Sequence, residues 1–109
     1  MNKIKLYTEK IFEDIKYIDE EGKEYWLARE LQSTLGYHQW RSINDLIVRA
    51  KVACKESKYN VDDHFAVQRK MIKLAKGATR NINNYKLSRY ACYLIVQNGN
   101  SHMKVIALI

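Results

Sequence analysis

The chain has 109 residues, of which 47% are hydrophobic and 28% charged, a composition typical of one globular domain and not of a disordered segment. No window approaches about 18 uninterrupted apolar residues, and the first dozen residues lack the apolar core of a secretion signal, so we expect a cytoplasmic protein without a membrane span. The formal net charge of +7 is unevenly placed, because residues 64–109 carry eight Lys or Arg and no Asp or Glu. Such one-sided charge is typical of proteins that bind nucleic acid.

The first expected elements are a helix and a β-hairpin. Apolar residues recur at three- and four-residue spacing near the start, which predicts an amphipathic helix over the first dozen residues: Ile4, Tyr7, Ile11 and Ile15. Residues 12–18 and 24–27 are β-prone runs on either side of an acidic turn, and they are predicted to pair as a hairpin. Gly22 would supply the left-handed backbone that the turn requires.

Two helices are expected next, at residues 28–37 and 39–58. In the first, Ala28, Leu31 and Leu35 fall on one face, and Gly36 stands where a helix commonly ends in a left-handed residue. The second has the longest periodic stripe in the chain: Trp40, Ile43, Ile47, Ala50 and Cys54. This spacing predicts a helix that faces the core, with polar residues on its other side.

The last third of the chain predicts a short helix, a second hairpin and a buried helix. Asp62 or Asp63 can cap one or two helical turns. The β-prone runs 71–75 and 83–87 bracket residues 76–82, which predicts a hairpin with a basic tip. Ser88 can cap an apolar helix closed by Gly99, and residues 101–109 begin like another helix. The fold class expected for residues 1–109 is a mainly helical α+β single domain, with about four to five helices and two small β-hairpins.

Catalytic and metal-binding signatures are not found. The run Asp62-Asp63-His64 resembles a metal cluster, but adjacent side chains point in different directions, so capping is the better interpretation. Cys54 and Cys92 lie far apart in apolar surroundings and are interpreted as buried thiols. No nucleophile elbow, zinc-protease, phosphate-loop or dinucleotide motif is present, and we expect neither enzymatic activity nor a cofactor.

Two groups of residues are candidates for contact with nucleic acid. One is the basic stretch around the predicted second hairpin: Arg69, Lys70, Lys73, Lys76, Arg80 and Lys86. The other is the outer face of the long helix, which follows a short helix and Gly36 in the outline of a helix-turn-helix: Arg41, Asn44 and Lys51. Contacts from such residues to phosphates give affinity without sequence information. A solvated surface with routine charge remains the alternative for both groups.

Three stretches resemble a known family: EYWLARELQSTLGYHQWRSINDLIVRA at 24–50, DDHF at 62–65 and LSRYACYLIVQNGN at 87–100. They look like the N-terminal part of the DNA-damage-inducible protein D family and, more distantly, the BRO amino-terminal domains of viral and phage antirepressor-like proteins. The resemblance implies a mixed α+β domain, a role in DNA-damage (SOS-type) or mobile-element biology, and binding to DNA or to DNA-bound proteins. Of the two nucleic acids, we expect DNA more than RNA. It also implies that residues 1–109 are the front part of a longer protein.

Two further expectations concern partners. If the domain is instead a protein-interaction module that acts on a DNA-bound repair or regulatory protein, exposed aromatic residues should matter more than charge, with Tyr37, Trp40 and Tyr59 as the candidates. The tail 101–109 puts Met103, Ile106 and Ala107 on one face of a helix too short to persist alone. That apolar face predicts a homodimer, or an extensive symmetric contact, through the tail.

Overall fold

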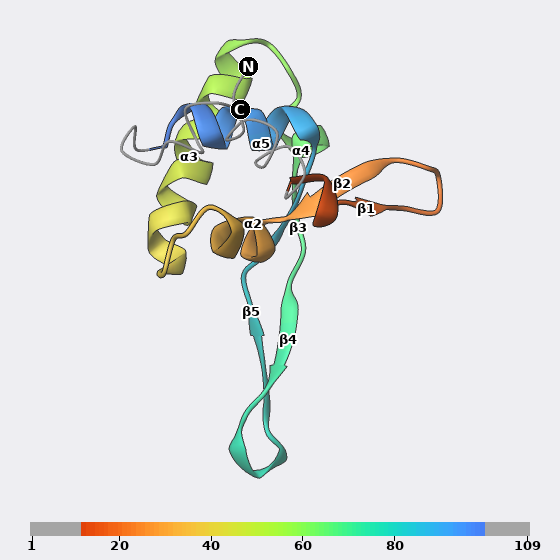
Figure 1. Ribbon diagram of the computed structural model, residues 1–109, viewed down its shortest axis with the longest axis vertical. Coiled ribbons are helices and arrows are strands. Elements are labelled where there is room, and N and C mark those ends of the chain that lie inside the picture. Colours follow the sequence, from red (N-terminus) through yellow and green to blue (C-terminus); the bar gives the residue numbers. More distant parts are fainter. Residues whose placement is uncertain (1–11, 100–109) are drawn as a thin grey trace.

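The computed structural model describes residues 12–99. Helices and a small sheet form a body, and a two-stranded ribbon projects away from it (Figure 1). In chain order the elements are β1 (Tyr17–Ile18), β2 (Glu24–Leu27), α2 (Ala28–Thr34), α3 (Trp40–Glu56), α4 (Val61–His64), β3 (Phe65–Val67), β4 (Lys70–Lys73), the 3₁₀ turn η1 (Ala75–Gly77), β5 (Thr79–Ile82), β6 (Tyr85–Leu87) and α5 (Arg89–Gln97). The α+β class is confirmed. The helix predicted over the first dozen residues and the tail 101–109 lie outside the described residues.

The larger sheet is antiparallel and has the strand order β1-β2-β6-β3. Its register places Trp26 and Phe65 on either side of Leu87. Because residues paired across a sheet point to the same face, these three large side chains form a row, and all three are buried. α5 packs against β2 and β6, so this row of side chains forms the part of the core that lies on the sheet.

α2 and α3 supply the rest of the core. Both helices form where the apolar spacing predicts them, and Gly36 adopts a positive φ of 82° after α2, as expected of a residue that ends a helix. The buried residues of α3 include four of the predicted stripe and one more: Ile43, Leu46, Ile47, Ala50 and Cys54. Trp40, the fifth predicted member, is only partly buried. The buried face is therefore shifted slightly from the predicted one.

α5 lies between α3, α4 and the sheet, which explains its apolar sequence. Its N-cap is Ser88, as predicted, and the Ser88 hydroxyl accepts a hydrogen bond of 3.0 Å from the Ala91 amide. The helix ends at Gln97, and the side-chain amide of Asn98 donates to the Leu94 carbonyl at 2.8 Å. Cys54 and Cys92 are both buried free thiols, and burial raises the pKa of each.

The first hairpin is shorter than predicted. Residues 12–14 form a helical turn, and only Tyr17–Ile18 pair with β2. The cause is a tertiary contact: the ring of Phe12 stacks on Trp26 with centroids 4.3 Å apart, and the Trp26 indole N–H donates to the Phe12 carbonyl at 2.9 Å. Gly22 occupies the turn with a positive φ of 81°, as predicted.

Two predictions for the middle of the chain were wrong in detail. The N-cap of α4 is Asn60 and not Asp62 or Asp63, because the helix begins earlier and the Asn60 side chain accepts from the Asp62 amide at 2.9 Å. In the second hairpin, β4 pairs with Thr79–Ile82 and not with residues 83–87. The latter run forms β6 instead, because its apolar Leu87 completes the buried row of the larger sheet.

Arg89 ties the N-terminal turn to the sheet at the protein surface. Its guanidinium contacts Glu24 and Glu13, each at 2.8 Å, and Lys16 contacts Glu13 at 2.8 Å. Hydrogen bonds from Lys16 and Arg89 lower the pKa of Glu13, and a hydrogen bond from Arg89 lowers the pKa of Glu24. The paired carboxylates raise the pKa of Arg89.

This cluster predicts a dependence of stability on pH. A carboxyl group whose folded pKa is depressed stabilises the fold above its unfolded pKa of about 4.3, and that contribution is lost as the pH falls through the folded pKa. Arg89→Gln should therefore lower the free energy of unfolding at pH 7 by no more than about 1 kcal/mol, because the pairs are exposed. Chemical denaturation from neutral to acid pH should show the difference from wild type shrinking below about pH 4. A constant difference would contradict this role.

Candidate nucleic-acid interface

The ribbon of β4 and β5, here called the arm and defined as residues 69–82, carries the densest positive charge in the described chain. It extends away from the body in Figure 1. Its five basic residues are all exposed: Arg69, Lys70, Lys73, Lys76 and Arg80. The arm contains no acidic residue, and no residue of the arm forms an ion pair with any residue from 12 to 99. Its charge is therefore left for the solvent or for a ligand.

The tip of the arm is a tight turn that contains Lys76. The Leu74 amide donates to the Ala78 carbonyl at 2.7 Å, which closes the turn. Lys76 and Gly77 both have left-handed backbones, with φ of 65° and 79°. Glycine adopts this conformation without strain, whereas lysine rarely does. The turn thus places Lys76 at the end of the arm that lies farthest from the body.

Both faces of the arm are basic. The register pairs Ile72 with Arg80 and Lys73 with Thr79. Because neighbouring residues on a strand point to opposite faces, Lys70 and Arg80 lie on one face and Lys73 on the other. A molecule that presents negative charge on two sides would therefore meet cations on each side of the arm.

Asn84 fixes the base of the arm to the body. Its side chain is only 4% exposed, and its amide oxygen accepts hydrogen bonds from the backbone N–H groups of Arg29 at 3.1 Å and Tyr85 at 2.9 Å. Its own carbonyl accepts from the Gln68 amide at 2.9 Å. A single buried residue thus joins the start of α2 to both strands at the base of the arm, through its side-chain oxygen and its backbone carbonyl.

We expect Asn84→Ala to lower the free energy of unfolding by roughly 1–3 kcal/mol, because it leaves two inward-facing backbone donors without their acceptor. Asn81→Ala is the matched control, since Asn81 is exposed on the arm and should cost less than about 0.5 kcal/mol. Urea denaturation of both variants provides the comparison. Equal effects would show that the Asn84 hydrogen bonds do not stabilise the fold.

Cations and aromatic rings alternate beside the base of the arm. The Arg29 guanidinium lies 4.0 Å from the centre of the Trp40 ring, and Trp40 stacks on Tyr85 with centroids 6.3 Å apart. Lys51 places its ammonium 4.5 Å from the centre of the Tyr85 ring. Such contacts hold long cationic side chains in a fixed position. One face of the Trp40 ring contacts Arg29, and the Tyr85 ring packs beside Trp40 and contacts Lys51. The two rings therefore hold the Arg29 and Lys51 side chains in place.

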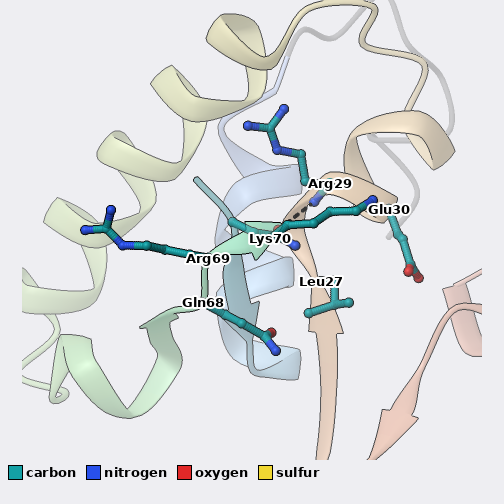
Figure 2. Close-up of a pocket in the computed structure, with 7 residues that line it drawn as sticks. Leu27, Arg29, Glu30, Gln68, Arg69 and Lys70 are labelled. Carbon is teal, nitrogen blue, oxygen red and sulfur yellow. Dashed lines mark hydrogen bonds between the residues drawn. The ribbon is translucent and has the colours of Figure 1, made fainter. Parts of the chain in front are cut away.

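A hollow of about 200 Å³ lies at the base of the arm, and it is lined by Leu27, Arg29, Glu30, Gln68, Arg69, Lys70 and Asn84. Its charged side chains do not converge. Arg69 and Glu30 extend to opposite sides in Figure 2, and Arg29 points away from both. A compact ligand needs polar groups that converge on it. This arrangement suits contact with an extended molecule better.

The residues predicted to contact nucleic acid do not form one surface. Five lie on the arm, but Lys86 stands on β6 in the sheet, with its ammonium 4.2 Å from the centre of the Tyr25 ring. The hollow next to Lys86 is also lined by three acidic residues: Asp19, Glu24 and Asp63. On α3, Arg41 is exposed, whereas Asn44 and Lys51 are partly buried. Lys86 is thus separated from the arm by its acidic surroundings. Of the α3 residues, Lys51 lies near the base of the arm, because its ammonium contacts the Tyr85 ring.

The aromatic residues considered for a protein partner are also dispersed. Trp40 begins α3 and Tyr59 follows its end, and a helix of 17 residues spans about 25 Å. Tyr59 packs on Tyr90 and His64, with ring centroids 4.9 Å and 5.9 Å away. Tyr37 is partly buried, and its hydroxyl has no hydrogen-bond partner among residues 12–99. These three residues do not make one continuous aromatic patch.

Sequence reasoning missed Arg29 and Asn84. Arg29 stands in the acidic first third of the chain, so charge patterning did not select it. Asn84 falls in the run 83–87, which was predicted only as a strand of the second hairpin. Their roles depend on contacts between positions more than 50 residues apart, which no local pattern contains.

Two general findings bear on the kind of site. Within residues 12–99, no three His, Cys, Asp or Glu side chains gather closely enough to hold a metal ion. No helix in the same part of the chain is long and apolar enough to cross a membrane.

The fold and its arm define a small α+β domain from which a basic β-ribbon projects. A family model described as "BRO family, N-terminal domain" matches residues 14–107, and the chain belongs to this family. Among curated proteins it is similar to DNA damage-inducible protein D of Escherichia coli (strain K12), with 46% identity over 96 residues. The matched part is 88% of this chain and 35% of that relative. No solved structure matched the chain.

Proposed function

We propose that this domain binds duplex DNA through its arm, as the front, DNA-binding module of a regulatory protein of the DNA-damage-inducible, SOS-type class. One observation carries the proposal: the arm bears five exposed cations on both of its faces, and it has no acidic residue or ion-pair partner within residues 12–99. The family membership and the similarity to a DNA damage-inducible protein support the same reading.

The geometry of the arm favours DNA over RNA. The major groove of B-form DNA is about 12 Å wide and admits a two-stranded β-ribbon, whereas the major groove of A-form RNA is deep and narrow. In a groove, phosphates lie along both walls. Cations on opposite faces of the arm, such as Arg80 and Lys73, would each meet one wall.

The mode of binding follows from the residue types. Lys and Arg contacts to phosphates supply affinity and orientation without reading the sequence. The predicted residues of α3 would add further contacts: Arg41, Asn44 and Lys51, the last of which lies over Tyr85 near the base of the arm. The chain spans about a third of the length of the similar E. coli protein.

The proposal is tested by measuring binding over a series of salt concentrations. Three ligands are compared: a DNA duplex of about 20 base pairs, one of its single strands, and an RNA duplex of the same sequence. If all five arm cations contact phosphates, the logarithm of the DNA association constant should fall with the logarithm of salt with a slope of about −4.5. DNA duplex should bind more tightly than RNA duplex. Absent or salt-insensitive binding would refute the proposal and favour the protein-interaction module.

A further inference from the structure

We propose that Arg29, together with Arg80 of the arm, forms a defined binding site for one backbone phosphate of the DNA; this inference rests on the function proposed above. Arg29 lies on α2, outside the basic half of the chain, and nothing in its local sequence marks it as a contact.

The Arg29 guanidinium is held in place from two sides. Its Nε donates a hydrogen bond of 2.8 Å to the Asn83 carbonyl, and its plane lies over the Trp40 ring at 4.0 Å from the centre. Its backbone N–H is fixed by the buried Asn84. A guanidinium fixed in this way has little conformational freedom left to lose when it binds a ligand.

The charge of Arg29 is not neutralised. It forms no ion pair with any residue from 12 to 99. The adjacent carboxylate of Glu30 accepts a hydrogen bond of 2.6 Å from the Tyr17 hydroxyl, and in Figure 2 it points away from Arg29. The Nη atoms, which make the bidentate contact to phosphates, are the part of the group that the Nε hydrogen bond leaves available.

A second cation lies on the face of the arm that borders Arg29. Lys70 lines the hollow at the base of the arm together with Arg29, and the register of β4 and β5 puts Arg80 on the same face of the arm as Lys70. In agreement with this placement, the pKa of Arg29 is lowered by burial and also by the positive charge of Arg80. Holding two such charges together without a carboxylate is unfavourable in the free protein. An anion between them would remove the repulsion, and a phosphate offers the oxygen geometry that guanidinium groups bind.

The site has a geometric consequence for binding. Arg80 belongs to the arm and Arg29 to the body. A phosphate bound by both would therefore fix the arm against the body. This phosphate would lie at the edge of the groove, where the arm leaves the DNA. The remaining arm cations would then contact phosphates farther along the duplex.

The first test compares Arg29→Gln with Arg29→Lys in duplex binding at several salt concentrations. Arg29→Gln should weaken binding about tenfold at low salt and reduce the salt slope by about 0.9, the value for one lost phosphate contact. Arg29→Lys keeps the charge and should keep the slope. Arg49→Gln is the matched control, because Arg49 is exposed on α3 and its loss changes the net charge equally.

The second test uses side-chain NMR of ¹⁵N-labelled arginine in the full chain, with a duplex of about 12 base pairs as the probe. On DNA binding, the Arg29 and Arg80 guanidinium signals should shift and their Nη rotation should slow, whereas the Arg49 signal should not change. A purely structural role of Arg29 would leave its signal unchanged. Thermal unfolding confirms that each variant remains folded.

The outcomes separate this inference from the proposed function. Wild-type protein that does not bind the duplex would overturn both. Binding that depends on arm cations but weakens no more in Arg29→Gln than in Arg49→Gln would overturn the phosphate site alone. Loss of affinity in Arg29→Gln without a change of the Arg29 signal in the wild-type complex would overturn it as well.

Discussion

Removing three cations from the arm, by Lys73→Ala, Lys76→Asn and Arg80→Ala together, is expected to weaken binding to duplex DNA by a factor on the order of a thousand at low salt. Each charge-assisted contact is worth about 1.5 kcal/mol, and about 1.4 kcal/mol corresponds to a tenfold change in affinity. The salt slope should also become shallower by about 2.7. Asparagine is chosen for Lys76 because this residue has a left-handed backbone, which asparagine tolerates.

The control is a variant with the same change of charge elsewhere: Lys23→Ala, Arg49→Ala and Lys55→Ala. All three residues are exposed and lie outside the arm. Fluorescence anisotropy with a labelled duplex measures both variants across the salt series. If the two variants lose affinity equally, net charge alone drives binding and the arm has no special role. The melting temperature of both should remain close to that of the wild type, because exposed substitutions rarely change stability by more than about 0.5 kcal/mol.

Ile47→Ala is expected to lower the free energy of unfolding by roughly 2–5 kcal/mol. Ile47 is 0% exposed, in the middle of the buried face of α3 and within the cluster that joins α2, α3, α5 and the sheet. Removing its side chain leaves a cavity that the surrounding core fills only in part. Because a small domain has a total stability of only about 5–15 kcal/mol, the variant should be much less stable at room temperature.

Lys55→Ala is the matched control on the same helix, because Lys55 is exposed and should change stability by less than about 0.5 kcal/mol. Urea denaturation followed by circular dichroism measures both variants. A small effect of Ile47→Ala would mean that α3 does not face the core in this register. Lys51 is a less suitable control, because its ammonium lies over the Tyr85 ring.

The core and the candidate interface are separate parts of this fold. The buried residues come from the helices and the larger sheet, whereas nearly every residue of the arm is exposed. Substitutions in the arm should therefore change DNA binding without unfolding the domain, and substitutions in the core should do the reverse. The exceptions are Asn84 and Arg29, which belong to both parts because they join the arm to the body.

The sequence predicted the helices well, because their signals are local. The spacing of apolar residues in α3, the cap at Ser88 and the glycine after α2 each depend on residues within a few positions of one another. A basic hairpin was also predicted here from local β-propensity, although its second strand is Thr79–Ile82 and not the predicted run 83–87. The errors of this local kind were the capping residue of α4 and the place of Trp40 in the buried stripe of α3.

Strand partners were predicted less well, because pairing is decided by distant residues. Residues 85–87 are β-prone and could have continued the arm, but the register that buries Leu87 between Trp26 and Phe65 removes far more apolar surface from water. The helical turn at residues 12–14 has a similar cause, since Phe12 stacks on Trp26 across 14 residues of chain.

The sequence by itself determined the α+β class, the main helices and the excess of positive charge in residues 64–109, because composition and periodicity record these directly. Only the tertiary structure decided which cations stand together. It separated Lys86 from the arm, since β6 had to enter the sheet to bury Leu87. It also brought Arg29 from the acidic third of the chain to the base of the arm, where its Nε donates to the Asn83 carbonyl. Charge patterning reports the order of charged residues along the chain. A binding surface depends on which strands are buried in the core and which remain exposed, and this is decided by contacts between distant residues.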